Sequence, residues 1–355
     1  MVVGTCGFGS TGSSVITDYL KEYKNICVLD GIEFTWVSTT DGLIDLAYHV
    51  LNPHSRTSDS SIAIKRYYDL MEKVIPYYYN SGNLLPETFR ASTKKFIESI
   101  TDVKWKGFIH ESKMGYWEKK IKVSLLQRRI IPILERKKGY RVDMFPKKDF
   151  YLSVNPSNFY EVAKLHIKEL LVGMGADFNK MIVLDQPFPG NNPQACFPFF
   201  ENPYAIVVDR DPRDNYVFAK TKLMGRNYFM ATDSVEDFVK YYKAIRKEQP
   251  YLNNDNRVLF LQFEDMIYDY ENTTEKLRCF LNLPENPNPK SIFDPKLSIN
   301  NTQVFKRFPE YAKDIQYIEE QLTEYLYNFD KYGEIKISGE MFFGKSPLNK
   351  KENKG

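Results

Sequence analysis

The feature that most limits how this chain can fold is a glycine-rich segment at residues 7–14, with glycines at positions 7, 9 and 12. An apolar run at residues 1–5 precedes it, and residues 13–23 follow with apolar side chains at helical spacing. Glycine tolerates the tight turn that such a junction requires. We therefore predict that the chain begins with a buried β-strand, a tight loop and an α-helix.

The loop itself has the composition of an anion-binding site. Its glycines let backbone N–H groups converge on an anion, and the following helix adds positive charge at its N-terminus. Serine or threonine at positions 10, 11, 13 and 14 supplies hydroxyl donors. The spacing matches a Walker phosphate loop, except that the lysine is missing. We predict that the loop binds phosphate or sulfate, and a turn that only begins a helix is the structural alternative.

Further strands and helices indicate an α/β fold with a mainly parallel central sheet and helices on both faces, like that of P-loop NTPases. Binding residues then collect at the carboxyl ends of the strands. We treat residues 1–355 as a single domain with a flexible tail at 345–355. The predicted strands are 1–5, 25–29, 180–184, 203–208 and 257–263, and the predicted core helices are 13–23, 43–50, 158–172, 235–247 and 272–281.

Residues 59–155 differ from the rest and are interpreted as a large insertion. They are rich in tyrosine, lysine and arginine. Amphipathic patterns predict helices at 60–79, 86–100 and 121–136, and alternation predicts a β-hairpin at 139–154. We expect the insertion to cover the nucleotide core and to shape the site of a second substrate.

The overall composition excludes several classes of protein. Its 49 basic and 46 acidic side chains give a net charge of +3, too near balance for a nucleic-acid-binding coat. The 4 cysteines are too far apart for a zinc ribbon, and the 4 histidines show no metal-ligand spacing, so we predict no metal site. No apolar run approaches the ~20 residues of a membrane helix. Because the first strand leaves no room for a signal peptide, we expect a cytoplasmic protein.

A second anion site is indicated after the strand at 203–208. The chain there runs directly into a turn that contains Arg210 and Arg213. The forked guanidinium group of arginine suits recognition of a terminal phosphate. The alternative is that the aspartates at positions 209, 211 and 214 hold these arginines in a surface ion-pair cluster.

A third segment, residues 258–265, is an apolar strand that ends in Phe-Glu-Asp and is followed by a helix with a Phe-Leu-x-Leu ending. In order and spacing, this segment, the phosphate loop and the arginine turn together resemble the sulfotransferases that use 3′-phosphoadenosine 5′-phosphosulfate (PAPS), of the carbohydrate, bacterial-like type. The resemblance covers residues 1–30 and roughly 180–330. It implies PAPS as co-substrate, its bisphosphate PAP as product, and a hydroxyl group, on a carbohydrate by analogy, as acceptor.

The resemblance implies roles for individual residues. Arg210 corresponds to the arginine that holds the 3′-phosphate of the donor, and Phe263 to an aromatic residue near the adenine. Lys306 and Arg307 are similar to a late basic loop that closes on the 3′-phosphate, with an ordinary surface pair as the alternative. The residues that would hold the 5′-phosphosulfate are Gly9, Ser10, Thr11, Gly12, Ser13 and Ser14.

Two positions depart from the family pattern. Phe218 replaces a usual serine, and Ser10 stands where a lysine often stabilises charge on the leaving oxygen. Either another cation supplies this charge, or turnover is slow, or the chain is inactive. The candidate substitutes, between which the sequence does not choose, are Lys65, Arg66, Lys164 and Lys168.

Sulfuryl transfer to a hydroxyl also needs a base that removes the proton as the oxygen attacks. Asp185 ends the strand at 180–184, where the family often places a histidine, and a carboxylate serves if partial burial raises its pKa. Glu33, just after the second strand, is the other candidate, because some carbohydrate sulfotransferases use a glutamate in about that place.

Two other functions stay open at this stage. An apolar strand that ends in an aspartate also resembles the magnesium-binding strand of P-loop kinases and NTPases that use ATP, although the absent lysine argues against them. A non-catalytic nucleotide-binding relative is the third hypothesis. For the first, the large insertion favours an extended acceptor, and Trp105 and Trp117 suit stacking on sugar rings.

Overall fold

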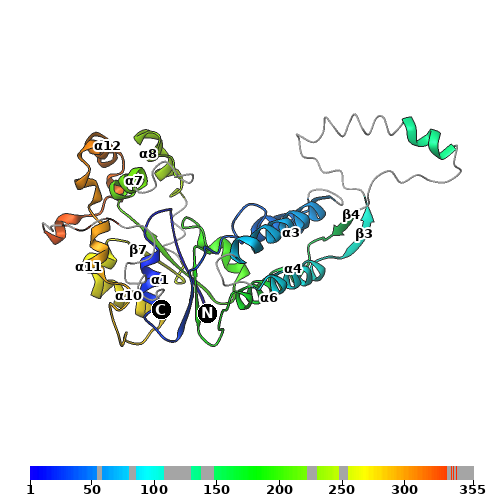
Figure 1. Ribbon diagram of the computed structural model, residues 1–355, viewed down its shortest axis with the longest axis horizontal. Coiled ribbons are helices and arrows are strands. Elements are labelled where there is room, and N and C mark those ends of the chain that lie inside the picture. The colour runs from blue at the N-terminus through cyan, green and yellow to red at the C-terminus, as the bar shows by residue number, and fades with distance from the viewer. Residues whose placement is uncertain are drawn as a thin grey trace.

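Five parallel strands form the central sheet of the computed structural model, in the order β2-β5-β1-β6-β7 (Figure 1). They are β1 (Val2–Gly7), β2 (Ile26–Leu29), β5 (Met181–Asp185), β6 (Pro203–Asp209) and β7 (Val258–Gln262). The predicted mainly parallel sheet is confirmed, and each predicted strand end lies within two residues of the observed one. The structure describes residues 1–53, 58–79, 85–107, 129–136, 148–221, 230–247, 255–333, 337, 339 and 341.

The register of the strands brings their carboxyl ends to one edge. Thr5 of β1 pairs with Asp185 of β5, and Gly7 pairs with Val208 of β6. The loop after β1, the turn after β5 and the arginine turn after β6 therefore leave the sheet side by side. This edge is where parallel sheets bind ligands.

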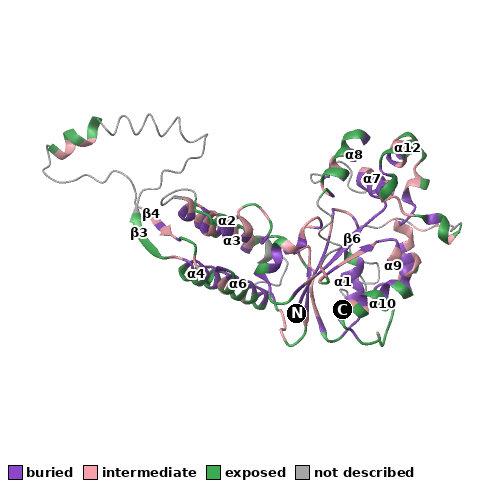
Figure 2. Ribbon diagram, turned by 180° about the vertical axis from the view of Figure 1, so that it is seen from behind, coloured by how far each residue is buried: buried purple, intermediate pink, exposed green. Residues whose placement is uncertain are grey.

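Side chains of the strands alternate between two hydrophobic cores, as the two-residue period of a strand dictates. Val2 and Leu184 belong to one core, whereas Val3 and Val183 belong to the other. Buried residues concentrate along the strands and on the inner sides of the helices (Figure 2). The predicted helices on both faces are confirmed. The first core includes α2 (Leu43–Leu51), α3 (Ser58–Tyr79), α4 (Pro86–Ser99) and α6 (Phe159–Gly173); the second includes α1 (Ser14–Leu20), α9 (Asp265–Tyr268) and α10 (Tyr270–Leu281).

A third core joins helices near the arginine turn, two of which the sequence patterns did not predict. These two are α7 (Pro212–Thr221) and α12 (Ala312–Gln321), and α8 (Val235–Ala244) packs with them. Among the helices that the structure describes, none is long and apolar enough to cross a membrane. The shorter elements are α11 (Pro295–Ser298) and 3-10 turns at Pro193–Phe199, Ile299–Asn301, Val304–Arg307, Pro309–Tyr311, Thr323–Tyr325 and Phe329–Tyr332.

The helices α3, α4 and α6 form an arm that projects from the sheet and carries a two-stranded sheet, β3 (Val103–Gly107) and β4 (Lys148–Leu152), farther out (Figure 1). The helix α6, which we predicted as part of the core, lies against α4 in this arm. Trp105 of β3 stacks on Phe150 of β4, with ring centroids 4.5 Å apart. Both rings are thereby engaged with each other within the small sheet.

The structure describes only residues 148–154 of the hairpin predicted at 139–154, so that hairpin stays a prediction. Strand β4 pairs antiparallel with β3, which lies more than forty residues earlier in the chain, with Val103 opposite Leu152. Residues 139–147 lie outside the described residues. So do Trp117, residues 121–128 of the helix predicted at 121–136, and the tail at 345–355, whereas residues 129–136 are helical as predicted.

A buried hydrogen-bond chain fixes the helices of the arm to one another. The Tyr67 hydroxyl lies 2.8 Å from Nε2 of His166, and the Ser92 hydroxyl lies 2.7 Å from Nδ1. Because the Ser92 hydroxyl donates its hydrogen to Glu169, Nδ1 of His166 must carry a proton and donate it to the Ser92 oxygen. Nε2 then accepts a hydrogen bond from the Tyr67 hydroxyl. The ring of Phe96 stacks on the imidazole. His166 is thus a packed structural residue.

This environment predicts a stability effect of His166 that depends on pH. Burial lowers the pKa of His166 from 6.5 to about 3, so the unfolded chain binds the proton more strongly than the folded one. The contribution of neutral His166 to the free energy of unfolding is therefore complete above pH 6.5. It is lost as the pH falls, by about 2 kcal/mol between pH 7 and pH 5. Urea unfolding of wild type and His166→Gln at both pH values should show this slope in the difference between the two proteins. An unchanged difference would contradict the assigned environment.

Candidate active site

A cavity of about 650 Å³ opens at the carboxyl edge of the sheet, between the loop after β1 and the turns after β5 and β6. Its volume is typical of sites for a nucleotide-sized ligand. Most of the residues singled out in the sequence line it, whereas Lys306 and Arg307 are not among the described residues that do. Those that line it are Gly9, Ser10, Thr11, Gly12, Ser13, Ser14, Glu33, Asp185, Arg210 and Phe263.

The backbone of the loop explains its glycines. Gly9, Ser10 and Gly12 have φ angles of 90°, 53° and 85°, in the left-handed region that side chains with a Cβ atom adopt reluctantly. A Cβ atom on Gly12 would also lie 2.4 Å from the ring of Phe263. Glycine at position 12 is therefore required both by the turn and by the approach of the β7 segment.

Side chains from two neighbouring turns hold the loop in place. Gln186, after β5, donates to the Ser13 hydroxyl at 2.6 Å. Asn215, in the first turn of α7, donates to the carbonyl oxygens of Gly9 and Ser10 at 3.1 and 3.3 Å. The sequence analysis missed both residues. The available signal was their position, because each is a polar side chain within a few residues of the end of a core strand.

Arg210 is buried and points toward the loop from the end of β6. Its guanidinium carbon lies 4.9 Å from the ring centre of Phe218 and 5.0 Å from that of Phe263, so both aromatic rings contact it. One Nη atom donates to the carbonyl of Ser10 at 3.4 Å and the other to that of Asn301. Its Nε has no hydrogen-bond partner among the described residues. Phe218, which stands where the family has serine, is therefore a packing partner of this arginine.

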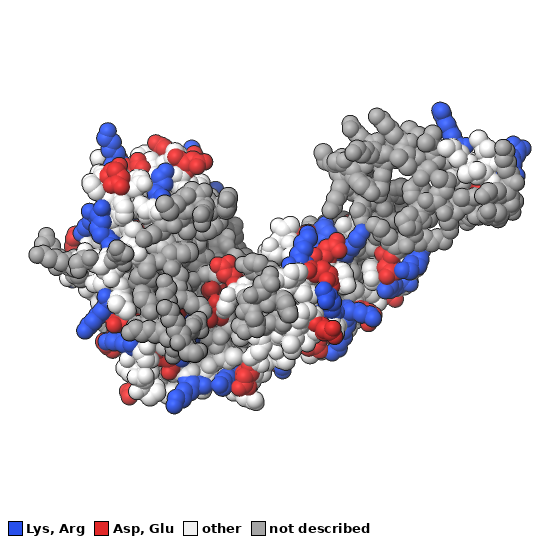
Figure 3. Space-filling view, viewed as in Figure 1, with Lys and Arg blue, Asp and Glu red and all other residues white. Residues whose placement is uncertain are grey.

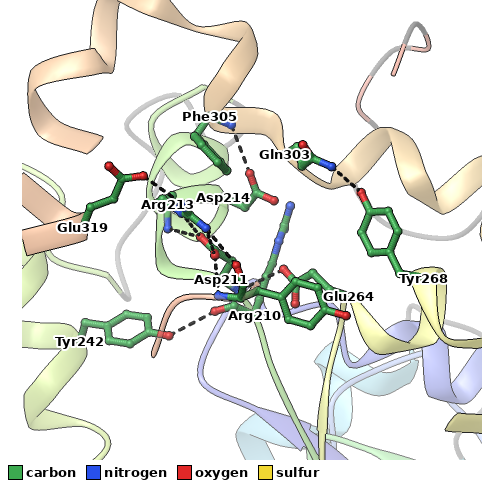
Figure 4. A network of polar contacts seen from close by, with 11 residues as sticks. Arg210, Asp211, Arg213, Asp214, Tyr242, Glu264, Tyr268, Gln303, Phe305 and Glu319 are labelled. Atoms are coloured by element: carbon green, nitrogen blue, oxygen red, sulfur yellow. Dashed lines mark hydrogen bonds and ion pairs between the residues drawn. The ribbon is translucent and has the colours of Figure 1, made fainter. Parts of the chain in front are cut away.

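The other arginine of the turn has a different role (Figure 4). Arg213 forms ion pairs with Asp211 at 2.7 Å and Glu319 at 2.8 Å. Asp209 is engaged by Arg246, with an N–O distance of 2.6 Å. The ion-pair alternative that the sequence left open therefore describes Arg213, whose guanidinium joins the turn to α12. The hydrogen bonds of Arg210, in contrast, go to the carbonyl oxygens of Ser10 and Asn301.

Two buried acids, Asp214 and Glu264, interact electrostatically with Arg210. Burial, with the neighbouring carboxylates next in size, raises the pKa of Glu264 well above its usual value. Burial raises the pKa of Asp214 to about 6, against the opposing effect of Arg210. One oxygen of each side chain has no hydrogen-bond partner among the described residues.

Asp185 and Glu33 line the opposite side of the cavity. Burial, followed by the negative charges of Glu33 and Asp30 and opposed by Lys21, raises the pKa of Asp185 from 3.8 to about 7. Glu33 is exposed on the segment after β2. The carbonyl of Asp185 accepts a hydrogen bond of 2.8 Å from the backbone N–H of Phe34, which fixes this segment against β5. Of the two candidate bases, Asp185 has the pKa suited to accepting a proton near neutral pH.

The remaining basic candidates lie elsewhere. Arg307 donates to the carbonyl oxygens of Asn300 and, at 3.0 Å, Gly339, and Lys306 is exposed. Among the described residues that line the cavity, Arg210 is the single lysine or arginine. None of the four proposed substitutes for the loop lysine lines it, namely Lys65, Arg66, Lys164 and Lys168. The described residues also contain no group of three or more His, Cys, Asp or Glu side chains placed to hold a metal ion.

Comparisons with known proteins give weak likenesses. No family model matches the chain, and neither does any curated protein sequence. Solved structures of sulfotransferases are among those that align with it, and three of them show the degree of likeness. The sulfotransferase domain of an olefin synthase from Synechococcus has a TM-score of 0.38 and 10% identity, over 92% of this chain and 94% of that one.

The other two structures are similar to a comparable degree. The sulfotransferase domain from the curacin biosynthetic pathway has a TM-score of 0.38 and 12% identity, over 92% of this chain and 98% of that one. A sulfotransferase from Alicyclobacillus acidocaldarius has a TM-score of 0.34 and 11% identity, over 91% and 97%. We base no conclusion on likenesses at this level, and assign the function from the residues of the cavity.

Proposed function

We propose that the protein is a sulfotransferase that moves the sulfuryl group of PAPS to a hydroxyl group of an acceptor, a carbohydrate by analogy. One observation carries this proposal. A single cavity of about 650 Å³ places a glycine-rich anion loop and the buried Arg210 near Asp185, whose raised pKa suits a base. This combination provides for a donor with phosphate groups at two positions and for removal of a proton.

The donor would be held by residues of three elements. The backbone N–H groups and hydroxyls of Ser10, Ser13 and Ser14 suit the 5′-phosphosulfate, and the fork of Arg210 suits the 3′-phosphate. Phe263 offers an aromatic face nearby. Not all of the lining favours an anionic donor, because the carboxyl groups of Asp18, Glu33 and Asp185 also line the cavity.

The transfer requires one proton acceptor and one stabilised leaving oxygen. As the acceptor oxygen forms its bond to sulfur, its proton passes to the Asp185 carboxylate. The bond between sulfur and the bridging oxygen breaks, and PAP leaves with the electron pair. With serine at position 10, hydroxyl and backbone donors replace the lysine charge, and we expect slow turnover as a result.

The runner-up is a kinase or NTPase that uses ATP and magnesium. It is favoured by the place of Asp185 at the end of β5, directly beside the phosphate loop. Against it stands the missing lysine of the Walker loop. A non-catalytic relative that binds the nucleotide alone is the third reading.

Thermal unfolding with nucleotides separates these functions. PAP at about 100 times its dissociation constant should stabilise the protein by about 2.7 kcal/mol, without magnesium. ATP should stabilise it less under the same conditions. Stabilisation by ATP only when magnesium is present, with no effect of PAP, would refute the proposal. Tight binding of PAP without transfer of labelled sulfate from PAPS to any member of a glycan panel would favour the non-catalytic relative.

A further inference from the structure

A second cavity, of about 380 Å³, adjoins the first. Glu33 and Thr35 line both, so the two spaces meet at these side chains. Its volume lies at the lower end of the range for small-molecule sites. The other residues that line it come from the segment before α2 and from α3, and they are Trp36, Thr39, Leu70, Lys73 and Val74.

The walls of this second cavity combine apolar and hydroxyl groups. Leu70 and Val74, one turn apart on α3, are partly buried against the first core. Thr35 and Thr39 add hydroxyl groups that donate and accept hydrogen bonds. A ring with an apolar C–H face and hydroxyls at its edge matches such walls better than a purely apolar ligand does.

Lys73 brings a positive charge to this cavity, and Glu33 brings a negative one at the junction with the first cavity. Lys73 is exposed at the rim, and among the described residues that line the cavity it is the single lysine or arginine. The adjacent acid, Glu72, is occupied by Arg90 through three hydrogen bonds of 3.1 to 3.2 Å. Basic and acidic side chains are interspersed over the helices of the arm (Figure 3). Any selection by charge must therefore come from a local side chain and not from a broad field.

We propose that the second cavity binds the acceptor, and that Lys73 selects acceptors that carry a carboxylate beside their hydroxyl groups. The inference rests on the proposed function and adds the chemical class of the acceptor. A hydroxyl of the bound ring passes the junction at Glu33 and faces Asp185, while a carboxylate elsewhere on the acceptor pairs with the Lys73 ammonium group. The exposed rim lets an extended acceptor continue along the arm.

The test compares two probes that differ in one functional group. We would measure by calorimetry the binding of a short hexuronic acid oligosaccharide, and of its carboxyl-reduced counterpart, to the protein saturated with PAP. The wild type should bind the acidic probe about tenfold more tightly, as expected for one charge-assisted contact. Lys73→Ala should remove this preference and Lys73→Arg should restore most of it. The matched control is Lys94→Ala, on the exposed surface of α4, which should leave the preference unchanged.

The outcomes separate the inference from the proposed function. If PAP binds and neither oligosaccharide does, or if Lys73→Ala weakens both probes equally, the assignment of the second cavity is wrong while the donor site stands. If PAP does not bind at all, the proposed function fails first. Equal affinity of the wild type for the two probes would also overturn the role of Lys73.

Discussion

Replacing Arg210 by alanine should weaken the binding of PAP by about 100-fold and leave the affinity for AMP, which has no 3′-phosphate, nearly unchanged. Arg210 is 3% exposed and its guanidinium group lies against two aromatic rings, so it is ordered before any ligand arrives. A preordered, forked cation loses little entropy on binding and makes charge-assisted hydrogen bonds. Calorimetry with both nucleotides measures the ratio of affinities directly.

Arg213 provides the matched control from the same turn. It pairs with Asp211 and Glu319, so Arg213→Ala should lower the free energy of unfolding and leave the ratio of PAP to AMP affinity unchanged. Arg210→Lys keeps the charge but not the fork and should recover only part of the binding. An equal loss of PAP and AMP affinity in Arg210→Ala would contradict the assignment of this residue to the 3′-phosphate.

The sheet could be predicted from the sequence because its strands are buried on both sides. Such strands appear as continuous apolar runs, and β6 (Pro203–Asp209) is fully apolar between its first residues and Asp209. The ends of these runs also located much of the cavity, since parallel strands bring their carboxyl ends together. Asp185 and Arg210 were singled out by these positions together with the family resemblance.

Other features depend on contacts that no local pattern contains. Strand β4 pairs with β3 from a distant part of the chain, a pairing that the alternation around β4 does not indicate. The composition of the turn does not distinguish Arg210 from Arg213; the resemblance favoured Arg210, and the contacts with Glu319 and Phe218 give the physical difference between the two. The hydrogen bonds of Asn215 to the loop join residues more than two hundred positions apart.

Replacing Asp185 by asparagine should lower kcat/KM for sulfuryl transfer by about 10²- to 10⁴-fold, the usual contribution of a general base. The folded carboxyl has a pKa of about 7, so the wild-type rate should rise with pH and level off above that value. The mutant should lose this rise. Transfer from labelled PAPS, measured between pH 5 and pH 9, gives both the rate and the profile.

Unfolding experiments test the pKa of Asp185 independently, and the pH dependence of stability that we expect from it is opposite in sign to that of His166. Because the folded pKa of Asp185 is raised from 3.8, the folded state holds this proton more strongly, and stability falls as the pH rises from about 4 to about 7. Asp185→Asn should therefore unfold at higher urea concentration than the wild type at pH 8, and by a smaller margin at pH 5. Glu33→Gln, at an exposed position on the same side of the cavity, should keep the rise of the rate with pH but move it to lower pH, because loss of the Glu33 charge lowers the pKa of Asp185. If instead Glu33→Gln abolishes the rise of the rate with pH while Asp185→Asn keeps it, Glu33 is the base and burial of Asp185 serves only the packing of β5.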